Sequence, residues 1–176
     1  MAEFTIRVLE KKDYLIYRKL RLYGLKRDPE AFGSTYALEI ARPIAFYRKK
    51  FRESWTTEKV FIIGAFVGKA LVGMAGFYRE EGAKVGHKGQ LYGMIVDRKY
   101  RGQGIGRAIV AALIDRAGKL KGLEQIKLAV NPKFGAAVGL YKQCGFREYG
   151  VERRGMKYKG KYSDLVLMDL ELGRGK

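Results

Sequence analysis

The sequence predicts a mixed α/β fold of the α+β kind, in which a mostly antiparallel sheet is flanked by helices. Two apolar runs joined by the two-residue turn Gly68-Lys69 are typical of an antiparallel hairpin. Further along, an apolar strand pattern is followed by a glycine-rich turn and then by apolar residues at helical spacing. A length of 176 residues, 47% of them hydrophobic, suffices for one core, so we expect a single domain over residues 1–176.

The N-terminal third predicts one strand followed by helices. Asp13 is placed to cap the first helix, and Asp28-Pro29 ends it. Pro43 divides the next helical stretch, because proline starts a helix more readily than it continues one. The predicted elements are a strand at Phe4–Leu9, a helix from Asp13 through Lys26, a loop at Asp28–Thr35 and helical residues at Tyr36–Trp55.

A hairpin and a third strand occupy the middle of the chain. The hairpin pairs Val60–Val67 with Ala70–Tyr78, and both runs are rich in β-branched and aromatic residues. Arg79–Lys88 is polar and glycine-rich, and we expect a loop there. It leads into a further apolar strand at Gln90–Val96.

The C-terminal half alternates helices with strands. Gln125–Val130 predicts a strand, Ala136–Cys144 a short helix, and Phe146–Arg153 and Ser163–Leu172 two closing strands around a basic, glycine-containing loop. The helix after the glycine-rich turn is indicated by apolar residues at helical spacing, namely Ile105, Ala108, Ile109, Ala112, Leu113 and Ala117.

Lysine and arginine outnumber aspartate and glutamate 36 to 18, which gives a net charge of +18 at pH 7 and attracts polyanions. The basic residues are scattered, without the block of five or six that is typical of a nucleic-acid-binding tail. We therefore interpret the charge as a generally basic surface. The alternative is a nucleic-acid- or ribosome-associated binding protein that uses this charge together with the 12 tyrosines.

Cysteine usage and hydropathy indicate the setting in which the protein works. Cys144 is the one cysteine, so no internal disulfide can form, and a reducing cytoplasmic location fits. No run of about 18 apolar residues predicts a membrane span. We expect no metal, because no cluster of Cys and His has ligand spacing. His87, the one histidine, stands before the central strand and is a candidate site residue.

The glycine-rich turn has the features of a phosphate site. A helix N-terminus exposes unpaired N–H groups and a partial positive charge, and glycines allow a phosphate to approach that backbone. The turn lacks the Gly-Lys-Ser/Thr that closes a P-loop, and its G-x-G-x-G pattern differs from the G-x-G-x-x-G of dinucleotide-binding folds. The candidate residues are Arg101, Gly102, Gln103, Gly104, Ile105 and Gly106.

These residues resemble the GNAT superfamily of acyl-CoA N-acyltransferases, whose pyrophosphate loop reads Arg/Gln-x-x-Gly-x-Gly/Ala. Arg101, Gly104 and Gly106 match it. The segment from Ala137 to Phe146 looks like the family's A-x-x-L-Y-x-x-x-G-F helix, and the resemblance is strongest over Leu91–Phe146. It implies a GNAT fold, acetyl-CoA as co-substrate, and direct transfer of the acetyl group to an amine of a small molecule or protein.

The resemblance also assigns roles within the site. The strand residues Met94, Ile95 and Val96 would hold the thioester carbonyl and the pantetheine arm through backbone N–H groups, if this strand splays from its neighbour. Tyr141 stands where the family has a tyrosine next to the cofactor sulfur, which makes it the candidate general acid; the other interpretation is a core tyrosine. Asn131 is a further candidate contact to the cofactor. The base stays open among Glu39, Glu80, Glu81 and Asp97.

The chain departs from the family pattern at two positions. Phe134 occupies the place of a common cofactor-contacting Asn, and Ala129 that of the catalytic Glu of the ribosomal-protein alanine acetyltransferases. Residues 28–34 and 157–164 resemble segments of bacterial members whose substrates are mostly unassigned. The acceptor therefore stays open, as do a homodimeric assembly and a fold that binds CoA without catalysis.

Overall fold

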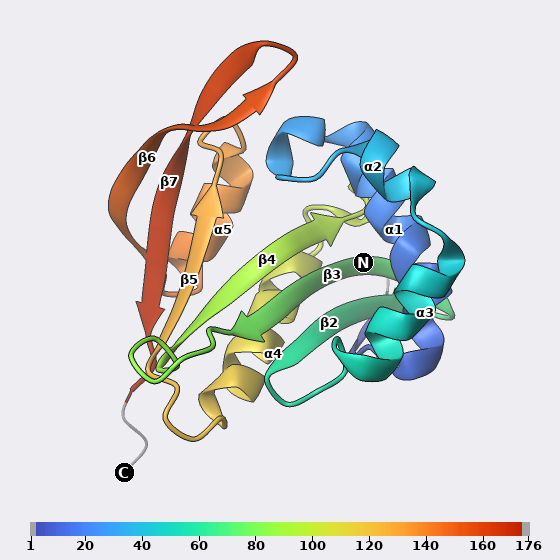
Figure 1. Ribbon diagram of the computed structural model, residues 1–176, viewed down its shortest axis with the longest axis horizontal. Helices are drawn as coiled ribbons and strands as arrows, with labels where there is room; N and C mark the ends of the chain where they lie inside the picture. Colours follow the sequence, from blue (N-terminus) through green and yellow to red (C-terminus); the bar gives the residue numbers. More distant parts are fainter. Residues whose placement is uncertain (1–2, 174–176) are drawn as a thin grey trace.

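The computed structural model describes residues 3–173 and contains one seven-stranded sheet in the order β1-β2-β3-β4-β5-β7-β6 (Figure 1). Neighbouring strands are antiparallel except for the parallel pair β4 and β5. The predicted mixed, mostly antiparallel fold class is confirmed. The strands are β1 Thr5–Val8, β2 Val60–Val67, β3 Ala70–Arg79, β4 Lys88–Val96, β5 Gln125–Val130, β6 Arg147–Tyr158 and β7 Lys161–Glu171.

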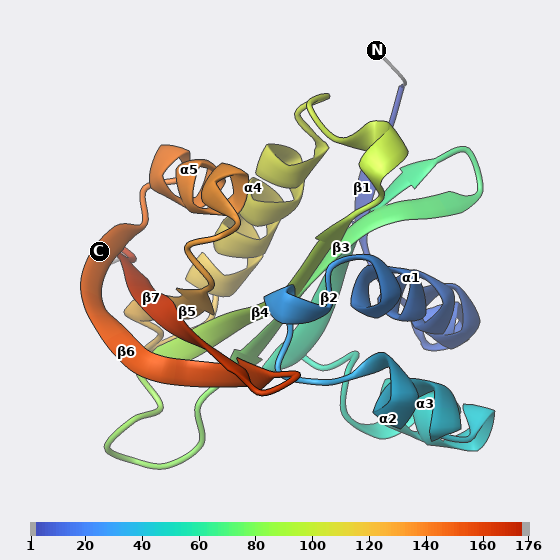
Figure 2. The same cartoon turned by 90° about the horizontal axis from the view of Figure 1, so that it is seen from above.

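Helices cover both faces of the sheet (Figure 2). The first three pack on one face, where Tyr47, Phe51 and Ile62 form a buried cluster. The last two pack on the other face over a larger cluster that includes Phe61, Ile109 and Met168. The α-helices are α1 Tyr14–Arg27, α2 Tyr36–Ala41, α3 Ile44–Glu53, α4 Ile105–Gly118 and α5 Gly135–Gln143, and short 3₁₀ helices form at Lys11–Asp13, Pro29–Ala31 and Arg98–Tyr100. None of the helices in residues 3–173 has the length and apolar content to cross a membrane.

An extra residue in β4 changes which side chains face each layer of helices. Gly76 pairs with Tyr92 and Met74 with Ile95, so β4 has one residue more than β3 between these pairs. The bulge includes Gly93, whose φ of +62° favours glycine. Because side chains alternate along a strand, the bulge reverses the alternation: Leu91 packs on the α4 side, while Ile95 joins the α1 side.

Two local expectations are wrong in detail. Asp13 precedes α1, but its carboxylate accepts hydrogen bonds from Arg7 and from the backbone N–H of Glu10, so it closes the preceding 3₁₀ turn and does not cap α1. The basic loop expected between the closing strands is largely strand, because β6 and β7 continue to a two-residue turn at Lys159-Gly160. Both turn residues have positive φ, as hairpin turns of type I′ require.

Candidate active site

The glycine-rich turn lies between β4 and α4, as the sequence predicts. Gly104 immediately precedes the 14-residue helix α4 with a φ of +80°, and Gly102 has a φ of +75°. Both are exposed, and a Cβ atom built on either meets no atom of the described chain within 4 Å. The first N–H groups of α4 therefore face open space, which is what an anion needs to approach them.

The parallel strands β4 and β5 splay apart on the side of the sheet that leads to this turn. The two parallel strands pair over three residues, from Lys88 with Gln125 to Gln90 with Lys127. Beyond Gln90 the strands diverge (Figure 1). β4 therefore splays from its neighbour, as the family resemblance implies, and Met94, Ile95 and Val96 lie in its free part, where they pair with β3 or pack on the helices.

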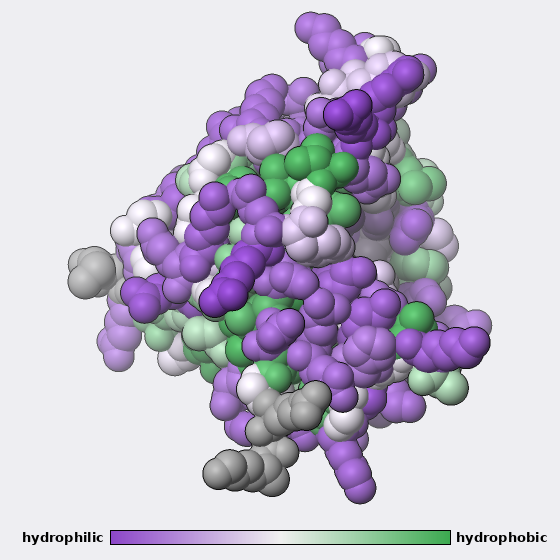
Figure 3. Space-filling view, turned by 90° about the vertical axis from the view of Figure 1, so that its left-hand side faces the viewer, coloured by the Kyte–Doolittle hydropathy of each residue, from purple (hydrophilic) through white to green (hydrophobic). Residues whose placement is uncertain are grey.

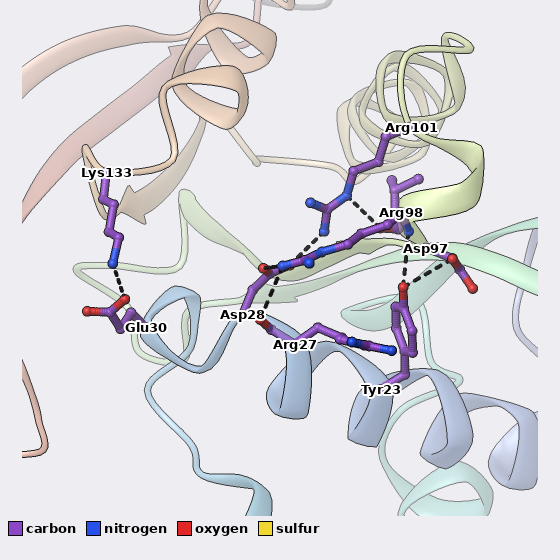
Figure 4. A network of polar contacts seen from close by, with 9 residues as sticks. Tyr23, Arg27, Asp28, Glu30, Asp97, Arg98, Arg101 and Lys133 are labelled. Atoms are coloured by element: carbon purple, nitrogen blue, oxygen red, sulfur yellow. Dashed lines mark hydrogen bonds and ion pairs between the residues drawn. The ribbon is translucent and has the colours of Figure 1, made fainter.

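The side chain of Arg101 has partners within the protein. Its Nε donates to the carbonyl oxygen of Val96 at 3.0 Å, and its guanidinium donates to the carboxylate of Asp28 at 2.7 Å. Arg98 donates to the other carboxylate oxygen of Asp28 at 2.6 Å (Figure 4). Arg101 therefore joins the turn to the end of α1, although half of its side chain stays exposed.

Burial would raise the pKa of Asp28, since its side chain is 14% exposed, but the hydrogen bonds from Arg101 and Arg98 outweigh burial and lower that pKa. The carboxylate is therefore ionised at neutral pH and holds both guanidinium groups. In the sequence, Asp28 marks the end of a predicted helix and the start of a predicted loop. An aspartate before a proline contains no local sequence signal that it will form ion pairs with Arg98 and Arg101.

A second link connects the same segment to β5. Lys133 forms an ion pair with Glu30, and the side-chain amide of Asn131 donates to the backbone carbonyl of Glu30 at 3.3 Å. Asn131 is buried, and its oxygen accepts the backbone N–H of Lys133. The segment Asp28–Glu30 therefore spans the open ends of β4 and β5 (Figure 4).

Gln103 and Ile105 complete the turn. The Gln103 side chain donates to the carbonyl oxygen of Lys99 at 3.3 Å. Ile105 is buried in the core below α4, whereas Gly106 approaches Met94 and Leu140 so closely that a Cβ atom would lie 3.3 and 3.1 Å from them. Gly106 thus allows α4 to pack tightly against β4 and α5.

Tyr141 lies in the last turn of α5 and is 5% exposed. Its ring packs edge-on against Phe146, with the ring centroids 5.9 Å apart. Burial raises the pKa of the hydroxyl well above its usual value, so the group is protonated at neutral pH. A raised pKa keeps the hydroxyl protonated but makes it a weaker acid, which fits a core tyrosine at least as well as a proton donor, so the catalytic role stays a prediction.

The carboxylates named as possible bases separate into two groups. Glu80 and Glu81 lie beyond the end of β3 that is away from the glycine turn, and Glu80 accepts a hydrogen bond from Gln90, where the pairing of β4 with β5 ends. Glu39 is buried under hydrogen bonds from Ser34 and Tyr47. Asp97 adjoins the turn and accepts from the hydroxyl of Tyr23 at 3.1 Å.

His87 lies outside this site. It precedes the first residue of β4, and the nine residues of β4 place it about 30 Å from the glycine turn at the usual rise per residue. It lines a separate hollow near the start of β5, and its carbonyl oxygen accepts the backbone N–H groups of Glu124 and Gln125. Within residues 3–173 no group of three or more His, Cys, Asp or Glu side chains is arranged to hold a metal ion.

A groove of about 590 Å³ opens between the segment after α1 and the β6–β7 hairpin. Its walls bring together two stretches about 120 residues apart in sequence, a distance that no sequence pattern spans. The residues that line it are Leu25, Lys26, Pro29, Phe32, Gly33, Ser34, Thr35, Tyr36, Ala37, Gly155, Met156, Lys157 and Tyr158.

Comparisons of this chain with a family model and with curated proteins agree with each other. Residues 23–146 match the model of the Acetyltransferase (GNAT) family. The chain is 33% identical over 82 residues to the [ribosomal protein bS18]-alanine N-acetyltransferase of Escherichia coli K12, covering 47% of this chain and 55% of that protein. It is 30% identical over 147 residues to the mycothiol acetyltransferase of Thermobispora bispora, covering 76% of this chain and 48% of that protein. The chain thus spans about half the length of these curated relatives.

Solved structures show the same fold. A GNAT-family acetyltransferase from Streptococcus pneumoniae superposes with a TM-score of 0.86 at 24% identity, over 97% of this chain and 100% of that one. The protein yncA of Salmonella typhimurium, solved with its cofactor acetyl-CoA, superposes with a TM-score of 0.81 at 18% identity, over 99% and 97% of the two chains. The family model, the sheet order and the splayed parallel pair agree, and the chain belongs to the acetyltransferase (GNAT) family.

Proposed function

We propose that this protein is an N-acetyltransferase that moves the acetyl group of acetyl-CoA to an amine by direct attack. The observation that carries the proposal is the glycine turn at the N-terminus of α4, placed on the side of the sheet where β4 and β5 splay apart. Membership of the GNAT family and the activities named for the relatives support it.

The residues of the turn fit the pyrophosphate of acetyl-CoA. Gly102 and Gly104 have positive φ and no side chain, so the backbone N–H groups at the start of α4 are open to an anion. Because the guanidinium of Arg101 is held by Asp28, we assign the main contacts to backbone N–H groups, and Arg101 to shaping the turn and to its positive field. Met94, Ile95 and Val96 would hold the pantetheine arm along the free side of β4.

Acetyl-CoA supplies an acetyl group that is activated as a thioester. In the transfer a C–N bond forms between the acceptor nitrogen and the acetyl carbonyl carbon, and the C–S bond breaks. One proton leaves the nitrogen for solvent, and one proton reaches the sulfur. Tyr141 is the proton donor in this proposal, because its hydroxyl is protonated at neutral pH and a thiol has a pKa of about 8.5.

The acceptor enters from the groove between α1 and the β6–β7 hairpin in this proposal. The groove includes Pro29, which lies in the segment Asp28–Glu30 that contacts Arg101 and Lys133. In this proposal the acceptor passes along this segment to the splayed part of β4. A volume of about 590 Å³ lies within the range of small-molecule and peptide-end sites.

The test combines binding with turnover. Calorimetry with acetyl-CoA measures binding alone, and release of free CoA thiol in the presence of an amine panel measures transfer. The thiol of Cys144 is partly buried and is subtracted as a protein blank. Binding with amine-dependent thiol release is expected. Failure of acetyl-CoA to bind the folded protein would refute the proposed function.

A further inference from the structure

The groove assigned to the acceptor has basic and aromatic walls. Lys26 and Lys157 stand on opposite walls with Tyr36 and Tyr158, and no aspartate or glutamate belongs to the described lining. Lys26 and Lys157 are exposed; the ammonium group of Lys26 lies 5.9 Å from the centre of the Tyr36 ring in the groove, and that of Lys157 lies 5.0 Å from the centre of the Tyr162 ring beside it. A polyamine or other cationic acceptor therefore meets charges of its own sign there.

Nearby carboxylates on the α1 side already have cationic or hydroxyl partners. Asp28 is held by Arg98 and Arg101, and Glu30 by Lys133. Glu39 lies buried below Ser34 and pairs with Arg42 at 3.5 Å. These carboxylates are therefore neutralised locally, and they offset little of the charge of the lysines.

The β6–β7 hairpin extends the basic wall beyond the groove. Its outer part, residues 152–164, carries five basic residues against Glu152 and Asp164, a net of +3, whereas the whole hairpin has a net charge of +1. Within residues 3–173, none of these five basic side chains forms an ion pair within 4 Å. Glu152 lies against Gly155, and Asp164 accepts a hydrogen bond from the backbone N–H of Arg154. Hydrophilic side chains cover the projecting tip of this hairpin (Figure 3). The five are Arg153, Arg154, Lys157, Lys159 and Lys161.

Two of these cations are positioned by a tyrosine. The guanidinium of Arg154 lies 3.8 Å from the centre of the Tyr162 ring, and the ammonium of Lys157 lies 5.0 Å from the same ring. Cation–π contacts of this kind hold a charge in place without neutralising it. Both charges therefore remain available to an anion at the mouth of the groove.

Resting on the proposed function, we propose that the acceptor is an amine carried by an anionic molecule, and that Lys26 and Lys157 determine this specificity. Their ammonium groups bind carboxylates that flank the reacting amine, and the hairpin attracts further negative charge along an extended acceptor. The chemistry required is a primary amine close to several carboxylates. The N-terminus of an acidic peptide and a free acidic amino acid both provide it.

Matched acceptors test the proposal. Three peptides share an N-terminal alanine, followed by four glutamates, four glutamines or four arginines, and arginine is chosen because its side chain does not compete as an acceptor. Free glutamate and spermidine complete the panel. We expect kcat/KM to fall about tenfold from the glutamate to the glutamine peptide and further for the arginine peptide, with the differences shrinking between 50 and 200 mM salt. Free glutamate with equal kcat/KM would identify a small acceptor, and a preference for the longer peptide identifies a polypeptide.

Charge-reversal variants test whether Lys26 and Lys157 cause the preference for the glutamate peptide. The double variant Lys26→Glu/Lys157→Glu should lose the preference for the glutamate peptide by at least about tenfold, while Lys121→Glu, with the same change of sign at the far end of the sheet, should keep it. Melting curves establish that the variants fold. Anisotropy of the labelled glutamate peptide, without acetyl-CoA, measures the same selectivity as binding.

The outcomes separate the two proposals. Preference for spermidine or the arginine peptide, or an unchanged preference in the double variant, overturns the anionic acceptor while leaving acetyl transfer intact. Absence of transfer to every amine, together with charge-dependent binding of the glutamate peptide, refutes the proposed function and keeps the selectivity of the groove.

Discussion

Asp28 joins two parts of the molecule through one carboxylate. It follows α1, and it holds Arg98 and Arg101, which belong to the turn before α4. Both contacts are charge-assisted and partly buried, so they contribute more than an exposed ion pair does. The position of the glycine turn relative to α1 therefore depends on a residue whose sequence context shows only the end of a helix.

Replacing Asp28 with Asn tests this role. Asp28→Asn should lower the free energy of unfolding at pH 7 by about 1.5–3 kcal/mol, the range for hydrogen bonds to charged groups. The folded-state pKa of Asp28 is depressed, so its contribution is complete above the unfolded pKa of about 3.9 and is lost as pH falls through the folded value. The difference from wild type should therefore be present at pH 7 and shrink below about pH 4 in urea unfolding.

Asp115→Asn is the control for that experiment. Asp115 is exposed and forms an ion pair with Lys119, the residue that follows the last turn of α4. Its loss should change the free energy of unfolding by less than about 0.5 kcal/mol. An effect of Asp28→Asn no larger than this would show that the Arg98 and Arg101 contacts do not stabilise the fold.

Tyr141 is the residue on which the proposed chemistry depends. Tyr141→Phe keeps the buried ring and removes the hydroxyl, so folding and acetyl-CoA affinity should be nearly unchanged while kcat falls by roughly 10²-fold, as for a lost general acid. Single-turnover kinetics under conditions in which chemistry limits the rate measure this. The control is Tyr149→Phe, which removes a hydroxyl from an exposed tyrosine on β6. Wild-type rates in a folded Tyr141→Phe protein would make Tyr141 a core residue.

At the scale of elements, the start of α4 depends on backbone conformation more than on side chains. Gly104 has a left-handed φ of +80° and free space around it. Valine there should cost about 1–2 kcal/mol of stability and weaken acetyl-CoA binding, because it strains the turn and places branched carbon at the anion site.

Gly118→Val is the matched control, at the other end of the same helix, where a Cβ also meets nothing within 4 Å and no positive φ is imposed. Calorimetry of acetyl-CoA binding on both folded variants compares the two ends. If Gly104→Val and wild type bind acetyl-CoA with equal affinity, the turn is not part of the cofactor site.

The bulge in β4 and its divergence from β5 leave one edge of this strand unpaired. Gly93 adds one residue to β4, which directs Leu91 and Ile95 to opposite layers, and pairing with β5 ends at Gln90. The remaining part of β4 is bonded on one side only. An extended ligand that accepts and donates backbone hydrogen bonds is suited to such an edge.

At the scale of the whole molecule, the charge of +18 should attract nucleic acid weakly and without sequence preference. Anisotropy with labelled RNA and DNA should show binding at 50 mM salt that falls by about 10³-fold or more at 200 mM, because counterion release dominates such contacts. Selective binding that persists at 200 mM salt would favour the nucleic-acid-binding alternative over a generally basic surface.

Periodicity and turn chemistry predict the local elements well. The hairpin joined by Gly68-Lys69, the division at Pro43 and the strand Gln125–Val130 are all confirmed, because each depends on neighbouring residues. The glycine turn is also predicted, since Gly102 and Gly104 report a backbone conformation that few other residues adopt. The closing hairpin is predicted less well: nothing in residues 154–162 distinguishes a basic loop from a long twisted hairpin.

The sequence by itself determined the class of fold, the order of its elements and the position of the glycine turn, because these follow from side-chain periodicity and from residues with special backbone conformations. The tertiary structure alone decided the rest. It brought Asp28 to Arg101, Glu30 to Lys133, and the segment after α1 to the β6–β7 hairpin. Contacts between residues far apart in sequence depend on how the sheet twists and on where β4 and β5 diverge. Neither feature can be predicted from a local sequence pattern.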